Sequence, residues 1–279
     1  MQTAFIELLA AATLIGTTAL ASPPSPGPGE GTPAERAAFA AETRGKGYGP
    51  QSPRDIDHHE GNNRQVFSFA PEAAQMTLCN IHLHESAEHK GGEFTTYAGD
   101  GHGSGFSYDG TLTPEELPPV AAKIGDGENG DLAPGDTVEA HFVYSTAKAI
   151  PGPTLQSCFT EATHNPQLRV EAMIGVLVND PDADDFTQIA RFETLDGLNQ
   201  LPDLPADLGA PTVYNGSTTG EDFDLKGSPV QVTWSVRPKV AKIDIGSLAR
   251  WFADNPFQEN HAHPVRNLVT DPDLLSQIE

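Results

Sequence analysis

The pattern of hydrophobic and polar positions from Gln51 onward predicts short strands rather than helices. Runs rich in β-branched and aromatic residues alternate with glycine, proline, asparagine and aspartate, which is typical of strands bounded by turns. The predicted strands read RQVFSFA, TLCNIHLH, DTVEAHFVYS, QLRVEAMIGVLVN, RFETL and SPVQVTWSV. Only IGSLARWFAD near the C-terminus reads as a clear helix. We therefore expect a single, mainly β domain at 51–279, with few short helices.

The first 50 residues lack this pattern. Residues 1–21 form an apolar stretch that ends in ALA, which has a small residue at its first and third positions; this predicts a cleaved signal peptide and a secreted or periplasmic protein. A membrane anchor is the less favoured alternative. Residues 22–50 are rich in proline, glycine and alanine, which predicts a flexible linker with one helical turn at 34–42. No later segment has the roughly 18 apolar residues that a membrane span needs.

The strongly acidic composition restricts the partners. Thirty-nine acidic residues against 16 basic ones give a formal net charge of −23. Because such a surface repels phosphate backbones and anionic lipids, we expect no nucleic-acid partner, and no membrane association after signal cleavage.

The chain has two cysteines, Cys79 and Cys158. In an exported protein, a pair of cysteines is most simply one disulfide. Free thiols, or a thiolate that binds a metal, stay open as alternatives.

One predicted strand, TLCNIHLH at 77–84, carries two histidines on one face. Residues two apart in a strand point to the same side, so His82 and His84 project together with Asn80 beside them. The opposite face is expected to carry Cys79, Ile81 and Leu83.

A second predicted strand, DTVEAHFVYS, supplies a third histidine. His141 shares its face with Glu139 and Val143, so a carboxylate lies beside an imidazole within an apolar run. A catalytic zinc site commonly has three protein ligands and one open position, and a ligating histidine commonly donates its other N–H to a carboxylate. We therefore predict a metal site at His82, His84 and His141. Glu139 is the expected acceptor, with its histidine partner left open.

These residues resemble the delta class of carbonic anhydrases in NIHLHESAEHKGGEF followed by GDTVEAHFVYS. The chain is also similar to the alpha class in five ordered fragments. They are QSPRDI at 51–56, HLH followed by EH, VEAHFV, YNGSTT at 214–219 and VTWSV at 232–236. The resemblance spans nearly everything after Gln51. It implies an alpha-like fold with one domain around a large, mostly antiparallel sheet.

The resemblance also implies a reaction, the reversible hydration of carbon dioxide to bicarbonate and a proton by a metal-bound hydroxide. His82, His84 and His141 would bind Zn²⁺, with another divalent ion such as Co²⁺ as an alternative. Glu139 would orient one of these ligands. The substrate would be a small molecule, carbon dioxide or bicarbonate, and the sequence does not indicate the oligomeric state.

Four further residues receive roles from the resemblance. Glu88 would be the buried carboxylate that orients the hydroxyl of Thr218, which would in turn accept a hydrogen bond from the attacking hydroxide. Val143 would line the carbon dioxide pocket, with Thr219 nearby. Because GSTT is one residue shorter than the alpha pattern, Thr218 and Thr219 could exchange roles.

A proton must leave after each hydration step, and histidine is the side chain that titrates near neutral pH. The sequence offers His58, His59, His89 and His102 without favouring one. A second H-x-H, at His261 and His263, is followed at once by a proline and is expected to lie in a loop without binding metal.

Two other functions fit part of the pattern. A cupin-like metalloenzyme would use Glu88 as a fourth ligand beside the three histidines and could hold iron or manganese. A non-enzymatic zinc-binding protein of the periplasm would hold the metal in a closed, four-ligand site.

Overall fold

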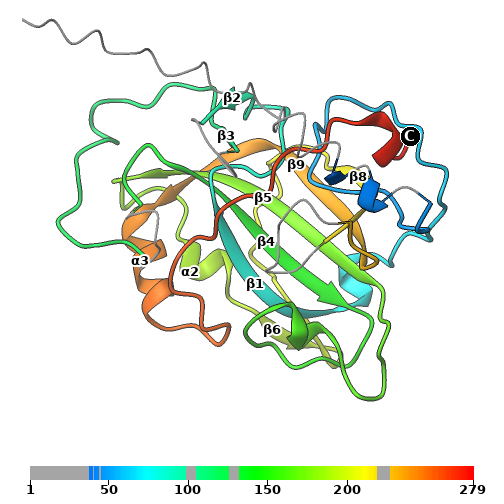
Figure 1. Ribbon diagram of the computed structural model, residues 1–279. Helices are drawn as coiled ribbons and strands as arrows, with labels where there is room; N and C mark the ends of the chain where they lie inside the picture. The colour runs from blue at the N-terminus through cyan, green and yellow to red at the C-terminus, as the bar shows by residue number, and fades with distance from the viewer. Residues whose placement is uncertain (1–37, 40, 44, 99–104, 126–131, 219–226) are drawn as a thin grey trace, which may run out of the picture.

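A five-stranded mixed sheet forms the centre of the computed structural model, which describes residues 38, 39, 41–43, 45–98, 105–125, 132–218 and 227–279 (Figure 1). In sheet order, the strands are β1 (Thr77–Glu85), β4 (Thr137–Ser145), β5 (Leu168–Val178), β9 (Gln231–Asp244) and β8 (Thr212–Ser217). Only β5 and β9 pair in parallel; the other neighbours are antiparallel. The prediction of a mainly β fold around a large, mostly antiparallel sheet is confirmed.

The remaining elements are short. They are η1 (Ala73–Gln75), β2 (Thr96–Tyr97), β3 (Phe106–Ser107), η2 (Leu155–Cys158), α2 (Phe186–Ile189), β6 (Glu193–Leu195), β7 (Leu198–Gln200), α3 (Ile245–Ala253) and η3 (Pro272–Leu274). Residues 38, 39 and 41–43 are also helical. The helix predicted from IGSLARWFAD is confirmed as α3, where the Asp244 carboxylate caps the first turn by accepting from the backbone N–H groups of Gly246 and Ser247.

The predicted strand RQVFSFA at 64–70 is wrong. Side chains from the sheet, rather than a neighbouring strand, satisfy this segment: the Asn215 amide donates to the Phe67 carbonyl, and the Ala70 N–H donates to the Thr233 hydroxyl. Val66 is left 87% exposed. The alternation of apolar residues is present, but none of the described strands pairs with this segment to form a ladder.

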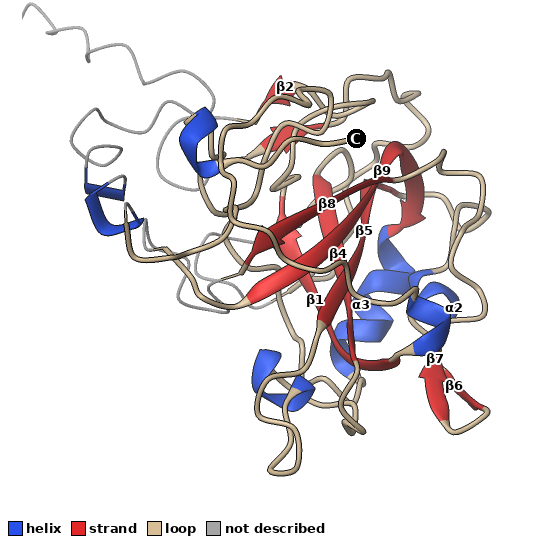
Figure 2. Ribbon diagram, turned by 90° about the vertical axis from the view of Figure 1, so that its right-hand side faces the viewer, coloured by secondary structure: helices blue, strands red, loops and turns tan. Residues whose placement is uncertain are grey.

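The sheet separates two layers of buried side chains. On one face, alternate residues of β4 such as Val138, Ala140 and Phe142 pack into a core with apolar residues of α2 and α3. Figure 2 shows these two helices side by side next to the sheet. The other face of β4 carries Glu139, His141 and Val143. All nine residues of β4 are buried, because both faces of this strand are covered.

A β-bulge corrects the predicted orientation of Cys79. The register of β1 against β4 shifts between Leu78 and Asn80. The extra residue reverses the alternation, so Cys79 packs with Val143 on the face of the histidines and not with Ile81 on the opposite face. There it forms the predicted disulfide with Cys158, which links the last residue of η2 to β1.

Two predictions for the N-terminal region remain predictions. The signal peptide at 1–21 lies outside the described residues, and the linker at 22–50 is described only at 38, 39, 41–43 and 45–50. In the part of the chain that the structure describes, no helix has both the length and the apolar character needed to cross a membrane.

Candidate metal centre

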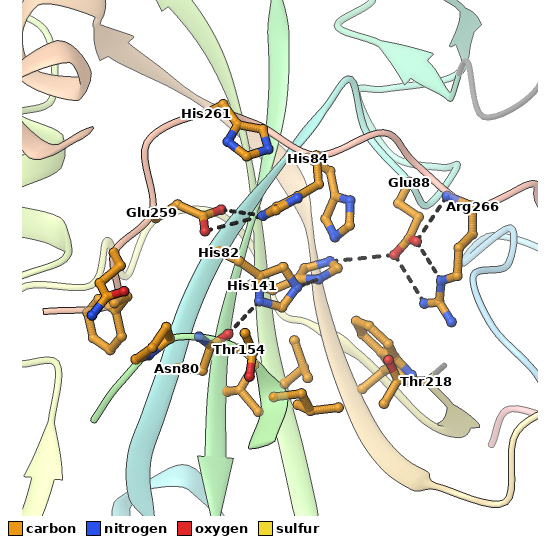
Figure 3. A pocket seen from close by; sticks show the side chains of 18 residues that line it. Asn80, His82, His84, Glu88, His141, Thr154, Thr218, Glu259, His261 and Arg266 are labelled. Carbon is orange, nitrogen blue, oxygen red and sulfur yellow. Dashed lines mark hydrogen bonds and ion pairs between the residues drawn. The ribbon is translucent and has the colours of Figure 1, made fainter. Parts of the chain in front are cut away.

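The antiparallel pairing of β1 with β4 brings the three predicted histidines together (Figure 3). His82 lies opposite His141, and His84 lies opposite Glu139. The ring centroids are 5.0 Å apart for His82 and His141, 4.6 Å for His84 and His141, and 5.2 Å for His82 and His84. One nitrogen of each ring lies within 4.8 Å of the other two, so the three rings converge on one point.

Hydrogen bonds assign the tautomers of the two histidines on β1. The Nδ1 atom of His82 lies 2.7 Å from the amide oxygen of Asn80, whose NH₂ group donates to the Gly152 carbonyl and so fixes the amide orientation. The Nδ1 atom of His84 lies 3.2 Å from the Pro264 carbonyl. Because both partners are acceptors, each Nδ1 carries the hydrogen and each Nε2 presents a lone pair.

His141 presents the opposite nitrogen. Its Nε2 atom lies 2.8 Å from the Glu139 carboxylate and therefore carries the hydrogen, while its Nδ1 atom lies 3.2 Å from Nε2 of His82. Two lone pairs that face each other at this distance repel unless a cation lies between them. A tetrahedral Zn²⁺ with Zn–N bonds of about 2.0–2.1 Å separates its ligand atoms by about 3.3 Å. The donor set therefore fits a divalent metal of this kind.

Burial keeps His82 and His84 neutral. Desolvation, followed by repulsion from His141, lowers the pKa of His82 well below its usual value of 6.5. Desolvation also lowers the pKa of His84, to about 4. Since only the neutral imidazole binds a metal, both rings are in the binding form at neutral pH.

The Glu139 carboxylate holds the far side of His141. One oxygen accepts from Nε2 of His141 and, at 2.7 Å, from Nδ1 of His89; the other accepts from the backbone N–H groups of Glu88 and His89. The second nitrogen of His89 accepts from the Tyr214 hydroxyl at 2.7 Å. Burial alone would raise the pKa of Glu139, but His89 and His141 outweigh it and keep that pKa well below its usual range. Glu139 is therefore a buried anion that orients His141.

Glu88 is bound by an arginine that sequence reasoning missed. Arg266 donates Nε–H to one carboxylate oxygen at 2.7 Å and Nη2–H to the other at 3.2 Å, and its Nη1 lies 3.5 Å from the Ser217 carbonyl. Burial would raise the pKa of Glu88, but the charge and hydrogen bond of Arg266, together with His84 and His141, outweigh burial and lower this pKa, so Glu88 is ionised. Its nearest approach to the cluster is 3.8 Å, to Nε2 of His141, the nitrogen turned away from His82.

A cavity of about 240 Å³ opens beside the histidines. Its apolar lining consists of Val143, Pro153, Leu155, Val170, Trp234 and Phe257. Val143, which was predicted to line the substrate pocket, is one of these residues, and Thr218 lines the cavity as well. Thr219 lies outside the described residues.

The segment after α3 supplies the other missed residues. Glu259, His261, His263 and Arg266 all line the cavity. The His263 N–H donates to the Leu83 carbonyl at 2.7 Å, and the His263 carbonyl accepts from the Glu85 N–H at 2.8 Å, which attaches this segment to β1 beside His84. The H-x-H motif was visible in the sequence, but its position was not, because the contact joins residues nearly 180 positions apart.

The histidines suggested for proton transfer are not placed for it within the described chain. His89 is fully buried between Glu139 and Tyr214. His58 and His59 are exposed but do not line the cavity. His102 lies outside the described residues.

Comparison with known proteins gives a family match. A family model for delta carbonic anhydrase matches residues 73–247, which include the three histidines and Glu139. No curated protein matches the chain.

Two solved structures were also compared. An alpha-carbonic anhydrase from Photobacterium profundum is 18% identical, with 83% of this chain and 90% of that chain covered, at a TM-score of 0.27. A hyperthermostable carbonic anhydrase from an active hydrothermal vent chimney is 16% identical, with 86% and 91% covered, at a TM-score of 0.28. At such low TM-scores, the family match alone carries the comparison.

The lowered histidine pKa values predict a pH-dependent stability of the metal-free protein. The unfolded chain takes up protons near pH 6.5, whereas folded His84 does so only near its pKa of about 4. The free energy of unfolding should therefore be highest above pH 6.5 and fall toward pH 4, by roughly 3 kcal/mol from this residue. Urea unfolding of the protein in the presence of a chelator, at a series of pH values, measures this free energy. His84→Gln should flatten the dependence and His58→Ala should not; an unchanged slope in His84→Gln contradicts the assignment.

Metal affinity separates the roles of His141 and Glu139. His141→Ala removes a donor and should abolish tight binding of Zn²⁺. Glu139→Gln keeps all three donors but weakens the orientation of His141, and should lower the affinity about 10–100-fold. Competition against a zinc chelator measures both variants, with His58→Ala as the control. Wild-type affinity in His141→Ala would exclude this residue as a ligand.

Proposed function

The chain belongs to the delta carbonic anhydrase family, and we propose that it catalyses the reversible hydration of carbon dioxide to bicarbonate and a proton with Zn²⁺ as its metal. The observation that carries the proposal is the convergence of three imidazole lone pairs on the wall of a largely apolar cavity. A bound Zn²⁺ would activate water at neutral pH by lowering its pKa from about 15.7 to about 7, an effect for which carbonic anhydrases are the standard example.

The residues of this chain bind the metal, orient its ligands and form the substrate cavity. His82, His84 and His141 hold the cation in their neutral forms, while Asn80 and Glu139 fix the ring orientations. The apolar wall suits carbon dioxide, which has no charge and no hydrogen to donate.

We assign the orientation of the attacking water to Thr218. Thr218 lines the cavity directly after β8, and Arg266 links the carbonyl of the preceding Ser217 to Glu88. An ionised Glu88 can only accept hydrogen bonds. A Thr218 hydroxyl that donates toward this carboxylate presents its own lone pair to the water, which orients the nucleophile.

The two alternative functions receive less support. A cupin-like site needs Glu88 as a ligand, but Arg266 donates to both oxygens of Glu88, and the approach of Glu88 to His141 is to Nε2, the nitrogen that does not face His82. A zinc-storage site needs four closed ligands. Among the described residues, the group that contains His82 and His84 consists of three histidines and faces a cavity.

We also propose that the protein is secreted or periplasmic. The apolar stretch at 1–21 is typical of a signal peptide. The Cys79–Cys158 disulfide supports the same compartment, because disulfides persist in oxidising environments.

Stopped-flow measurement of carbon dioxide hydration tests the proposed reaction, with metal content determined on the same sample. Hydration should disappear when a chelator strips the metal and return when Zn²⁺ is added back. A fully zinc-loaded protein that does not accelerate hydration would overturn the proposal.

A threonine pair tests the orientation step. Thr218→Ala should retain the zinc content of the wild type and lower the hydration rate roughly 100-fold, because the attacking water loses its alignment. Thr219→Ala is the matched control and should have the smaller effect. A loss confined to Thr219→Ala would transfer the role to that residue.

A further inference from the structure

Hydration of carbon dioxide releases one proton per turnover, and this proton must reach the solvent before the next turnover. The chain releases this proton only if it has the proposed function, and a group near the metal site must then carry the proton away. Among the described residues that line the cavity, the histidines outside the three-ring cluster are His261 and His263.

The two rings extend from the cluster along the C-terminal segment. The ring centroid of His263 lies 6.3 Å from those of His82 and His84, and the ring centroid of His261 lies a further 4.6 Å from that of His263. Figure 3 shows His261 and Glu259 on the same side of the cluster. His261 is half-buried, so its ring contacts both the cavity and the solvent.

His263 is held in place by a carboxylate. Its Nε2 atom lies 3.0 Å from one oxygen of Glu259 and 3.2 Å from the other. The same carboxylate also accepts from the backbone N–H of Leu83 on β1. These bonds fix His263 against the sheet, so it is less suited than its neighbour to release a proton to the solvent.

His261 has the tautomer that a proton acceptor needs. Its Nδ1 atom lies 2.7 Å from the amide oxygen of Asn260, so Nδ1 carries the hydrogen and Nε2 presents a lone pair. The titratable neighbours on its own segment are Glu259 and His263. Gly125, which packs against the His261 Cα, adds no charge.

We propose that His261 is the proton-transfer residue of this enzyme. Its neutral ring accepts at Nε2 the proton released by hydration, which arrives through water in the cavity, and becomes an imidazolium. It then gives the proton to a buffer base in the solvent and returns to the neutral form. A cavity of about 240 Å³ has room for several waters, since about 10–15 Å³ of such space is enough to hold one.

The kinetic test compares His261→Ala with His58→Ala, which removes an exposed histidine outside the cavity. At low buffer concentration, kcat for hydration should fall about 10-fold or more in His261→Ala. The ratio kcat/KM should stay at the wild-type value, because interconversion of carbon dioxide and bicarbonate is untouched. Added imidazole should restore kcat, and His58→Ala should match the wild type.

Three kinetic outcomes overturn the inference. These are wild-type kcat in His261→Ala at low buffer, a loss that imidazole does not restore, and an equal loss of kcat and kcat/KM. If the wild type itself hydrates no carbon dioxide while fully zinc-loaded, the proposed function fails first. An active wild type with an equally active His261→Ala variant removes only the role of His261.

A second readout does not depend on activity. Nuclear magnetic resonance of the ring C–H groups, assigned by their loss in His261→Ala, should show that His261 titrates reversibly with pH. Replacement of Zn²⁺ by paramagnetic Co²⁺ should shift this resonance more than that of His58. A His261 ring that does not titrate, or that Co²⁺ does not affect, contradicts the assignment.

Discussion

The register between β1 and β4 is the constraint on which the site depends. It sets His82 opposite His141 and His84 opposite Glu139, so two ligands from one strand meet one ligand and its carboxylate from the next. A slip of one residue would turn every side chain of β1 to the other face. The apolar residues between the histidines oppose this slip, because Ile81 and Leu83 pack into the core on the side of α3.

A buried polar layer then fixes the rings that the register brings together. Asn80 and Glu139 each accept from the ring nitrogen that points away from the cluster. An unpaired buried carboxylate would be costly, but Glu139 accepts four hydrogen bonds and Glu88 is paired with Arg266. The site is therefore preorganised by polar groups around the rings; Asn80, Glu88 and Arg266 also line the cavity, whereas Glu139 lies behind His141.

The sequence predicted those parts of the fold and site that depend on local alternation. The strands that became β1, β4, β5 and β9 have strong apolar patterns, and two-residue spacing placed His82 with His84. Cys79 was misplaced because a β-bulge leaves no signature in the local pattern. Arg266 and His261 were missed as site residues because their positions depend on contacts with β1 and Glu88 that lie far away in the sequence.

X-ray absorption at the zinc edge of the zinc-loaded protein determines whether three imidazoles hold the metal and leave one position open. We expect three imidazole nitrogens at about 2.0–2.1 Å and one oxygen that does not come from the protein. A sulfur ligand at about 2.3 Å, fewer than three imidazoles, or a fourth imidazole would contradict it.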